Sequence, residues 1–145
     1  RSAPLVNPLL LSSANRLELS VSSTAPDTSF VARLIEESAD GSSVRLIREA
    51  AATLSLPTSR ASTKLQYAPK ERVQIELDFW PIDWELPSGS RLRVDVSSSS
   101  FPALALHSNT AVHWNEAKER VPATQTIYTD GSRLVVKTIG GQKYE

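Results

Sequence analysis

Hydrophobic and polar positions alternate strictly in two runs between Arg72 and Pro102. The first run places an apolar side chain at every second position, namely Val73, Ile75, Leu77 and Phe79. The second run repeats the pattern with Leu92, Val94 and Val96. A period of two is that of a strand with one buried and one solvent-facing side. The two runs therefore predict strands of an antiparallel sheet whose apolar side covers a core.

Shorter runs elsewhere raise the expectation to about nine strands with little helix. They cover Asn15 to Ser22, with Leu17, Leu19 and Val21 inward, and then Phe30 to Glu36, Val44 to Ile47, Ala123 to Thr129 and Arg133 to Ile139. Glu49 to Leu54 is interpreted as a short strand, because it is flanked by Thr53 and Pro57 and has no helix cap. The one helical candidate, Ala111 to Glu119, is poor.

The turn signals indicate how these strands are connected. Asp40-Gly41 and Asp130-Gly131 are the dipeptides preferred in tight hairpins. Ser55 to Pro69, rich in Ser, Thr and Pro, is predicted to be a loop. The long link from Phe79 to Arg91 favours a Greek-key or jelly-roll crossing between two sheets. We therefore predict one all-β domain over residues 1–145, an antiparallel β-sandwich with a Greek-key or jelly-roll connection.

Composition narrows the classes of function. The 145 residues suffice for one domain with its own core, and without cysteine no disulfide or thiolate metal site can form. Lys plus Arg equals Asp plus Glu at 16 each, and no basic cluster occurs, which argues against nucleic-acid binding. No apolar run approaches the roughly 20 residues of a membrane span, so we expect a soluble chain of unassigned compartment. Because the chain lacks Met and starts at Arg1, we expect a domain, fragment or processed product of a longer protein.

Six sequence blocks carry a resemblance that covers nearly the whole chain. The blocks are Ala25 to Leu34, Leu77 to Pro81, Gly89 to Val94, Ser97 to Pro102, Asn109-Thr110 and Thr124 to Tyr128. In this order they resemble the C-terminal non-catalytic domain of the X-Pro dipeptidyl-peptidase and cocaine-esterase-like (CocE/NonD) serine hydrolases. Two positions depart from that family's pattern: Ser90 stands where a His is usual, and Ala111 where a Gly is usual.

The resemblance implies a galactose-binding-like jelly roll and a partner in the same polypeptide. In this family the catalytic Ser, Asp and His belong to an α/β-hydrolase domain upstream. None of its triad motifs can be placed on this sequence, so no catalytic residue is carried over. The implied role is an accessory domain that packs on the catalytic domain and helps to shape its substrate cleft.

The residues themselves offer little catalytic chemistry. Serine is abundant, but no G-x-S-x-G elbow occurs. The only imidazoles are His107 and His113, which fall in one predicted loop with a spacing that fits no common metal site. We interpret them as loop histidines; a base, a metal pair or an interface role are the alternatives. No catalytic, cofactor or metal residue is assigned.

The three tryptophans, Trp80, Trp84 and Trp114, have three interpretations: end plugs of the sandwich, anchors of an interface, or a platform for a ligand. Trp80 continues the alternation past Phe79 and should face away from the core. The nearby carboxylates Asp78, Asp83 and Glu85 form an acidic rim; a cation site there is conceivable, but no ligand loop with Gly spacing is present.

Two functions of different classes remain. The first is the accessory domain, whose predicted interdomain contact has an apolar centre and polar neighbours. Its residues are Trp80, Trp84, Phe101, Pro102, Leu104, Leu106, Asn109, Thr110 and Trp114. The second is a free-standing carbohydrate-binding or adhesion module. The sequence leaves homo-oligomerisation open.

Overall fold

The structure is a computed structural model that describes residues 1–55, 67–113 and 115–138. These residues form eight strands and no helix. The strands are β1 (Leu9–Leu11), β2 (Arg16–Ser23), β3 (Ser29–Glu37), β4 (Val44–Thr53), β5 (Val73–Asp78), β6 (Trp84–Leu86), β7 (Arg91–Ser97) and β8 (Gln125–Val135). In this part of the chain, no helix long and apolar enough to cross a membrane is found.

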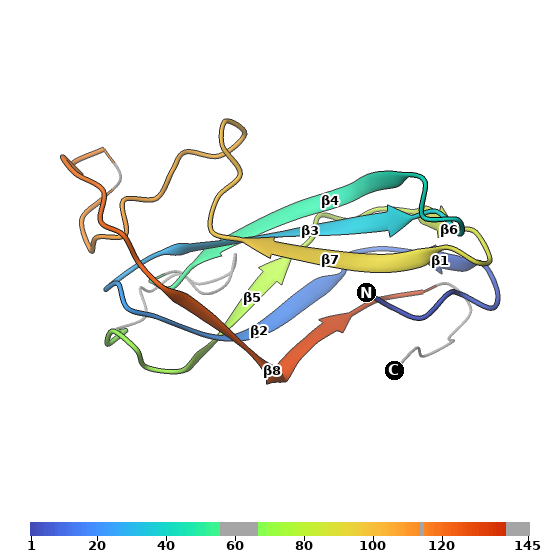
Figure 1. The fold of residues 1–145 in the computed structure, drawn as a ribbon, viewed down its shortest axis with the longest axis horizontal. Helices are drawn as coiled ribbons and strands as arrows, with labels where there is room; N and C mark the ends of the chain where they lie inside the picture. The colour runs from blue at the N-terminus through green and yellow to red at the C-terminus, as the bar shows by residue number, and fades with distance from the viewer. Residues whose placement is uncertain (56–66, 114, 139–145) are drawn as a thin grey trace.

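Two three-stranded antiparallel sheets face each other and enclose the core (Figure 1). One sheet has the order β5-β2-β8 and the other β4-β3-β7, while β1 and β6 form a separate pair at one end. Every second side chain of the central strands points between the sheets, as the alternation predicted. The buried side chains include Leu17, Leu19, Val21, Ile75 and Leu77 from one sheet and Phe30, Ala32 and Leu34 from the other. The predicted antiparallel β-sandwich is confirmed, and its jelly-roll connection stays a prediction.

The two alternating runs lie in the predicted orientation. Leu92 is buried, and Val94 and Val96 are half-buried against the core. Val73 is half-buried in the same way. Val94 and Val96 are shallower than the inward residues of β3 because β7 lies at a sheet edge, whereas Ile75 and Leu77 of the edge strand β5 are fully buried. Between β5 and β7 the chain crosses from one sheet to the other through β6, as the long link predicted.

The first Asp-Gly pair makes the expected hairpin. Gly41 has a φ of +72°, and β3 pairs with β4 around this turn. The Asp40 carboxylate accepts hydrogen bonds from Ser38 and Ser42, which lower the pKa of Asp40 to about 2. The predicted strands Val44 to Ile47 and Glu49 to Leu54 are one strand, β4. The pairing of β4 with β3 shifts by one residue opposite Leu34 and Ile35, which marks a bulge in β4.

The second Asp-Gly pair does not make a hairpin, so that prediction is wrong. Both flanking segments belong to β8 and pair with the same strand, β2. Tyr128 lies opposite Ser20 and Arg133 opposite Glu18, so the residues between them bulge out of the sheet. Arg72 holds the bulge by stacking on the Tyr128 ring and binding Asp130.

Other predictions fall wholly or partly outside the described residues. The predicted loop from Ser55 to Pro69 contains residues 56–66, which the structure does not describe. Described residues of the helical candidate Ala111 to Glu119 form turns and bends. The last strand ends at Val135 rather than Ile139, although Thr138 makes an isolated bridge to Leu11.

The seam between β7 and β8 is covered by the first residues of the chain (Figure 1). Ser2 exchanges two hydrogen bonds with Leu92. The Leu5 N–H donates to the Ser90 carbonyl, and the Leu5 carbonyl accepts from the Gly89 N–H. An apolar cavity of about 360 Å³ lies beneath this segment, with Leu134 among its lining residues.

Candidate functional site

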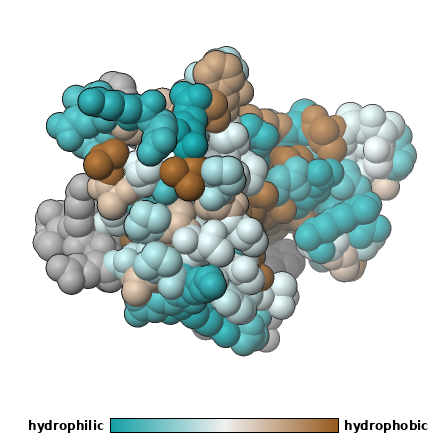
Figure 2. Space-filling view, turned by 60° about the vertical axis from the view of Figure 1, so that its left-hand side comes forward, coloured by the Kyte–Doolittle hydropathy of each residue, from teal (hydrophilic) through white to brown (hydrophobic). Residues whose placement is uncertain are grey.

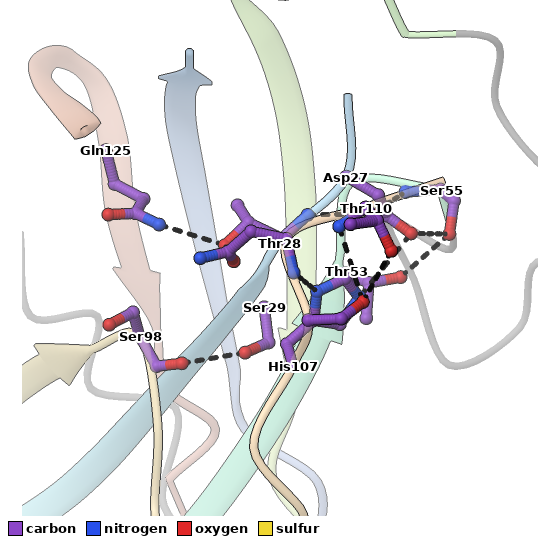
Figure 3. A network of polar contacts seen from close by, with 11 residues as sticks. Asp27, Thr28, Ser29, Thr53, Ser55, Ser98, His107, Thr110 and Gln125 are labelled. Atoms are coloured by element: carbon purple, nitrogen blue, oxygen red, sulfur yellow. Dashed lines mark hydrogen bonds and ion pairs between the residues drawn. The ribbon is translucent and has the colours of Figure 1, made fainter. Parts of the chain in front are cut away.

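Several of the sequence blocks meet at one end of the sandwich. The β2–β3 turn, the segment after β7 and the start of β8 all lie there (Figure 1). Their polar side chains form the network drawn in Figure 3. We call the segment from Ser98 to Thr124 the loop arm; it leaves β7 at this end and returns to β8.

Asp27, in the β2–β3 turn, is the buried carboxylate of this network. It is 9% exposed, and Oδ1 accepts hydrogen bonds from the backbone N–H groups of Thr28 (2.9 Å) and Ser55 (3.0 Å). Oδ2 accepts one from Ser55 Oγ (2.6 Å) and lies 3.6 Å from His107 Nε2. Burial raises the pKa of Asp27, but the contacts with His107 and Ser55 outweigh burial and lower the pKa below its usual value.

His107 is placed by this network rather than free for catalysis. Its Nδ1 accepts a hydrogen bond from the Asn109 N–H (3.0 Å), so in the neutral ring Nε2 carries the proton toward Asp27. A nucleophile relay needs a serine hydroxyl bonded to the imidazole, whereas Ser55 bonds to the carboxylate. The order of these contacts therefore differs from that of a nucleophile relay.

His113 lies apart from His107 and is exposed, with Nδ1 in a hydrogen bond to Asn115. In the described ranges no group of three or more His, Cys, Asp or Glu side chains could hold a metal ion. This finding includes the acidic rim of Asp78, Asp83 and Glu85.

Asn109 ties the loop arm to the two sheets. Its side-chain oxygen accepts a hydrogen bond from Thr28 Oγ1 (2.7 Å). The same Thr28 hydroxyl accepts a hydrogen bond from Gln125 Nε2 (2.9 Å) at the start of β8. Its Nδ2 donates to the Val121 carbonyl (2.7 Å). Asn109 has a φ of +60°, a left-handed conformation that Asn tolerates better than most residues. Thr110 bonds to Ser108 within the loop arm.

The start of the loop arm is fixed to the β4-β3-β7 sheet by hydrogen bonds. Ser29 Oγ donates to the Ser98 carbonyl (2.7 Å). Ser100 Oγ, which is buried, accepts from Arg33 (2.9 Å) and donates to Glu49 (2.8 Å). The next residue, Phe101, has 69% of its surface exposed. The anchored Ser100 side chain is therefore followed directly by an aromatic residue that is mostly exposed to solvent.

The surface around this end of the sandwich is otherwise mostly polar. Figure 2 shows apolar side chains there as separate brown spots in a teal and white surface. Leu104, Val112 and Val121 of the loop arm are exposed along with Phe101. A hollow of about 330 Å³ lies beside the network, lined by Ser98, Leu106, His107, Asn109, Arg120 and Val121.

The tryptophans that the structure describes lie at the other end of the sandwich. Trp80 comes just after β5, at the end of the sheet where the Phe79 N–H donates to the Asn15 carbonyl before β2. The Trp80 residue is 77% exposed, as predicted. Trp84 is half-buried, and its Nε1 donates to the buried carboxylate of Glu36 (2.8 Å). Arg45 lies over its ring and pairs with the same carboxylate. Trp84 thus plugs this end.

The predicted interdomain residues are consequently not one surface. The structure brings Phe101, Pro102, Leu104, Leu106, Asn109 and Thr110 together in the loop arm. Trp80 and Trp84 are separated from them by the length of the sheets, and Trp114 lies outside the described residues. Sequence reasoning missed Asp27, Ser55 and Gln125 as a joint site, because no local spacing indicates contacts between such distant residues.

Comparison with known proteins adds a family and several similar folds. The family model "X-Pro dipeptidyl-peptidase C-terminal non-catalytic domain" matches residues 1–135. The comparison with curated proteins found no match. Among solved structures, an α-amino acid ester hydrolase aligns over 93% of this chain and 24% of its own, with a TM-score of 0.79 and 21% identity.

Two further solved structures have the same fold. An aminopeptidase from a marine sediment archaeon (Thaumarchaeota) aligns over 96% of this chain and 25% of its own, at TM-score 0.82 and 18% identity. A CocE/NonD family hydrolase from Staphylococcus aureus aligns over 94% and 29%, at TM-score 0.67 and 19% identity. This chain therefore corresponds to between 24% and 29% of the length of these proteins.

Proposed function

Since the chain belongs to the family of X-Pro dipeptidyl-peptidase C-terminal non-catalytic domains, we propose that it serves a serine hydrolase as an accessory domain. Its partner is a catalytic α/β-hydrolase domain upstream in the same polypeptide. The accessory domain packs on that partner, stabilises it and contributes to the wall of its substrate cleft.

The observation that carries this proposal is the exposed Phe101, which directly follows the anchored Ser100. Interface anchors are commonly aromatic side chains that bind with little loss of conformational freedom. Arg33 and Glu49 anchor the side chain of Ser100 immediately before Phe101, while Phe101 itself is mostly exposed. The exposed ring buries little apolar surface in the isolated chain, whereas a partner domain that covers the ring would bury that surface.

The polar network at the same end supports a non-catalytic role. Asp27, Ser55 and His107 are close together, but their order of hydrogen bonds does not activate a nucleophile. Similar solved proteins carry the names ester hydrolase and aminopeptidase, so the partner's reaction is proposed to be acyl transfer to water from an ester or an X-Pro amide.

The alternative of a carbohydrate-binding module receives less support. A sugar platform needs aromatic rings displayed on one face, but the Trp84 indole is engaged by Glu36 and Arg45. Trp80 is exposed, but Trp84 does not supply a second exposed ring for a sugar to stack on.

The test is Phe101→Ala in the natural polypeptide, compared with Trp80→Ala at the opposite end. Both side chains are exposed in this chain, so neither loss should unfold the sandwich itself. We expect Phe101→Ala to weaken the contact between domains by about 2 kcal/mol, the typical cost of losing an aromatic anchor. Calorimetry should show the hydrolase domain unfolding at a lower temperature in this variant and near the wild-type temperature in Trp80→Ala.

Equal unfolding temperatures for wild type and Phe101→Ala would contradict the role of the loop arm. A drop confined to Trp80→Ala would move the contact to the other end of the sandwich.

A further inference from the structure

We infer that the outer face of the β4-β3-β7 sheet continues the docking surface that begins at Phe101. The occupant of this face is the catalytic hydrolase domain of the same polypeptide. This inference rests on the proposed function and adds which of the two sheets the partner covers.

The register of the strands identifies the side chains on this face. Phe30, Ala32 and Leu34 of β3 point into the core, so the residues between them point outward. Cross-strand pairing extends the outward set to both neighbours. It comprises Val31, Arg33, Ile35 and Glu37 of β3, Ala51, Glu49, Leu46 and Val44 of β4, and Ser97, Asp95, Arg93 and Arg91 of β7.

Two large apolar side chains are exposed on this face. Val44 is 58% exposed and Leu46 is 55% exposed, two positions apart on β4, and Leu46 lies beside the outward Ile35. Single exposed apolar residues are common on protein surfaces. We therefore ask whether the outer face of the other sheet carries such residues as well. The outer face of β5-β2-β8 carries Arg16, Glu18, Gln74, Glu76 and Thr126, together with the half-buried Tyr128 and Val135. Ile127 of β8 is 42% exposed, but it lies opposite the buried Val21, on the inner side of this sheet.

Four charged side chains of the outward set form two ion pairs within this face, while Glu37 pairs with Arg1 and Arg91 donates to the Ser2 carbonyl. Arg33 bonds to Glu49 at 2.8 Å, and Arg93 bonds to Asp95 at 2.7 Å. Burying an unpaired charge is strongly unfavourable, whereas a charge that keeps its partner loses less on desolvation. A partner can therefore cover this face without leaving these charges unpaired.

The loop arm connects this face with Phe101. In Figure 1 its first part rises beyond the outer face of the β4-β3-β7 sheet, at the end where β7 stops. Ser100 contacts Arg33 and Glu49, which belong to the outward set, and Phe101 follows directly. On this face Val44 and Leu46 lie at the end near Trp84 and Phe101 follows the opposite end, with Arg33 and Glu49 between them, so the proposed surface runs along the length of the sheet.

The comparisons indicate what covers this side. The solved hydrolases that share the fold are three to four times as long as the part that aligns with this chain, which covers 24%, 25% and 29% of them. The rest of such a polypeptide is the nearest and most concentrated occupant, because a tethered domain binds at a high effective concentration. A second copy of this chain is the competing occupant.

Cysteine accessibility in the natural polypeptide tests the inference, because this chain contains no cysteine of its own. Leu46→Cys reports on the proposed docking face, and Thr126→Cys on the outer face of the other sheet is the matched control. Each thiol is reacted with a maleimide in the folded and in the urea-unfolded polypeptide, and peptide mapping separates it from cysteines elsewhere. We expect the Leu46→Cys thiol to react at least about tenfold more slowly than the control after this normalisation, since a covered position reacts only from rare open states.

Equal rates at the two positions would overturn the inference while leaving the Phe101 contact of the proposed function intact. Slow reaction that becomes fast on dilution, together with a dimer in sedimentation, would also overturn it, because a second copy would then cover the face. Failure of the proposed function is distinct: the Phe101→Ala variant would leave the unfolding of the hydrolase domain unchanged.

Discussion

At the scale of single residues, Asp27 shows how one buried carboxylate holds distant segments together. It binds the segment after β4 through Ser55 and the loop arm through His107. Because these contacts favour the ionised form over the opposing effect of burial, the pKa of Asp27 is lower in the folded chain than in the unfolded chain. The folded state therefore binds fewer protons than the unfolded state at acidic pH, and its stability rises with pH there.

The prediction for Asp27→Asn is a change in the pH dependence of the free energy of unfolding. At neutral pH the variant should be less stable by about 1–3 kcal/mol, the cost of weakening buried hydrogen bonds. The wild type has its full Asp27 contribution above the unfolded pKa of about 3.9 and loses it as pH falls through the lower folded pKa. The two proteins should therefore converge below about pH 4, as measured by urea unfolding at a series of pH values.

Asp83→Asn is the control for this experiment, because Asp83 is exposed in the β5–β6 link. Its curve should follow that of the wild type. An Asp27→Asn curve that stays parallel to the wild type down to pH 2 would show that ionised Asp27 does not stabilise the fold.

At the scale of elements, the bulge in β8 shows where local sequence signals stop being sufficient. Asp130-Gly131 has the sequence of a hairpin turn, yet both sides of it pair with β2. Arg72, which lies far away in sequence, stacks on Tyr128 beside the bulge and binds Asp130. Gly131 fits this position because it has a φ of +106°.

We expect Gly131→Ala to destabilise the chain by about 1 kcal/mol or more, because an L-residue is strained at this φ. The added Cβ would also lie 3.3 Å from Arg72 Nη2, which already holds the bulge. Urea unfolding measures the loss, and Thr129→Ala, an exposed neighbour, should change stability by less than about 0.5 kcal/mol. Equal stability of Gly131→Ala and the wild type would mean that the bulge is not under this constraint.

The elements that sequence predicted well are those that depend on local alternation. The two runs from Val73 to Phe79 and from Leu92 to Val96 gave the strand faces directly, because a period of two sets which side chains point inward. The pairing of these strands and the merging of the segments of β4 and β8 could not be predicted in this way. They depend on partners across the sheet, as the shifts opposite Leu34 and Glu18 show.

At the scale of the whole molecule, the sandwich has two different ends and two different outer faces. One end holds the loop arm with exposed Phe101, and the other is plugged by Trp84 on Glu36. Sequence reasoning placed both sets of aromatic residues in one contact, since apolar character alone does not show at which end of a strand a residue lies. The resemblance blocks include Asp27, Ser100 and Asn109, but the hydrogen bonds of these residues to Ser55, Arg33 and Thr28 became visible only in the folded chain.

The central claim is that this chain is the non-catalytic partner of a serine hydrolase domain. The most direct test is labelling with an active-site fluorophosphonate probe, followed by peptide mapping, for both this chain alone and the natural polypeptide. The account predicts no label on the chain alone and stoichiometric label on a serine outside residues 1–145 of the polypeptide. Stoichiometric label on a serine of the chain alone, or none anywhere in the natural polypeptide, would contradict it.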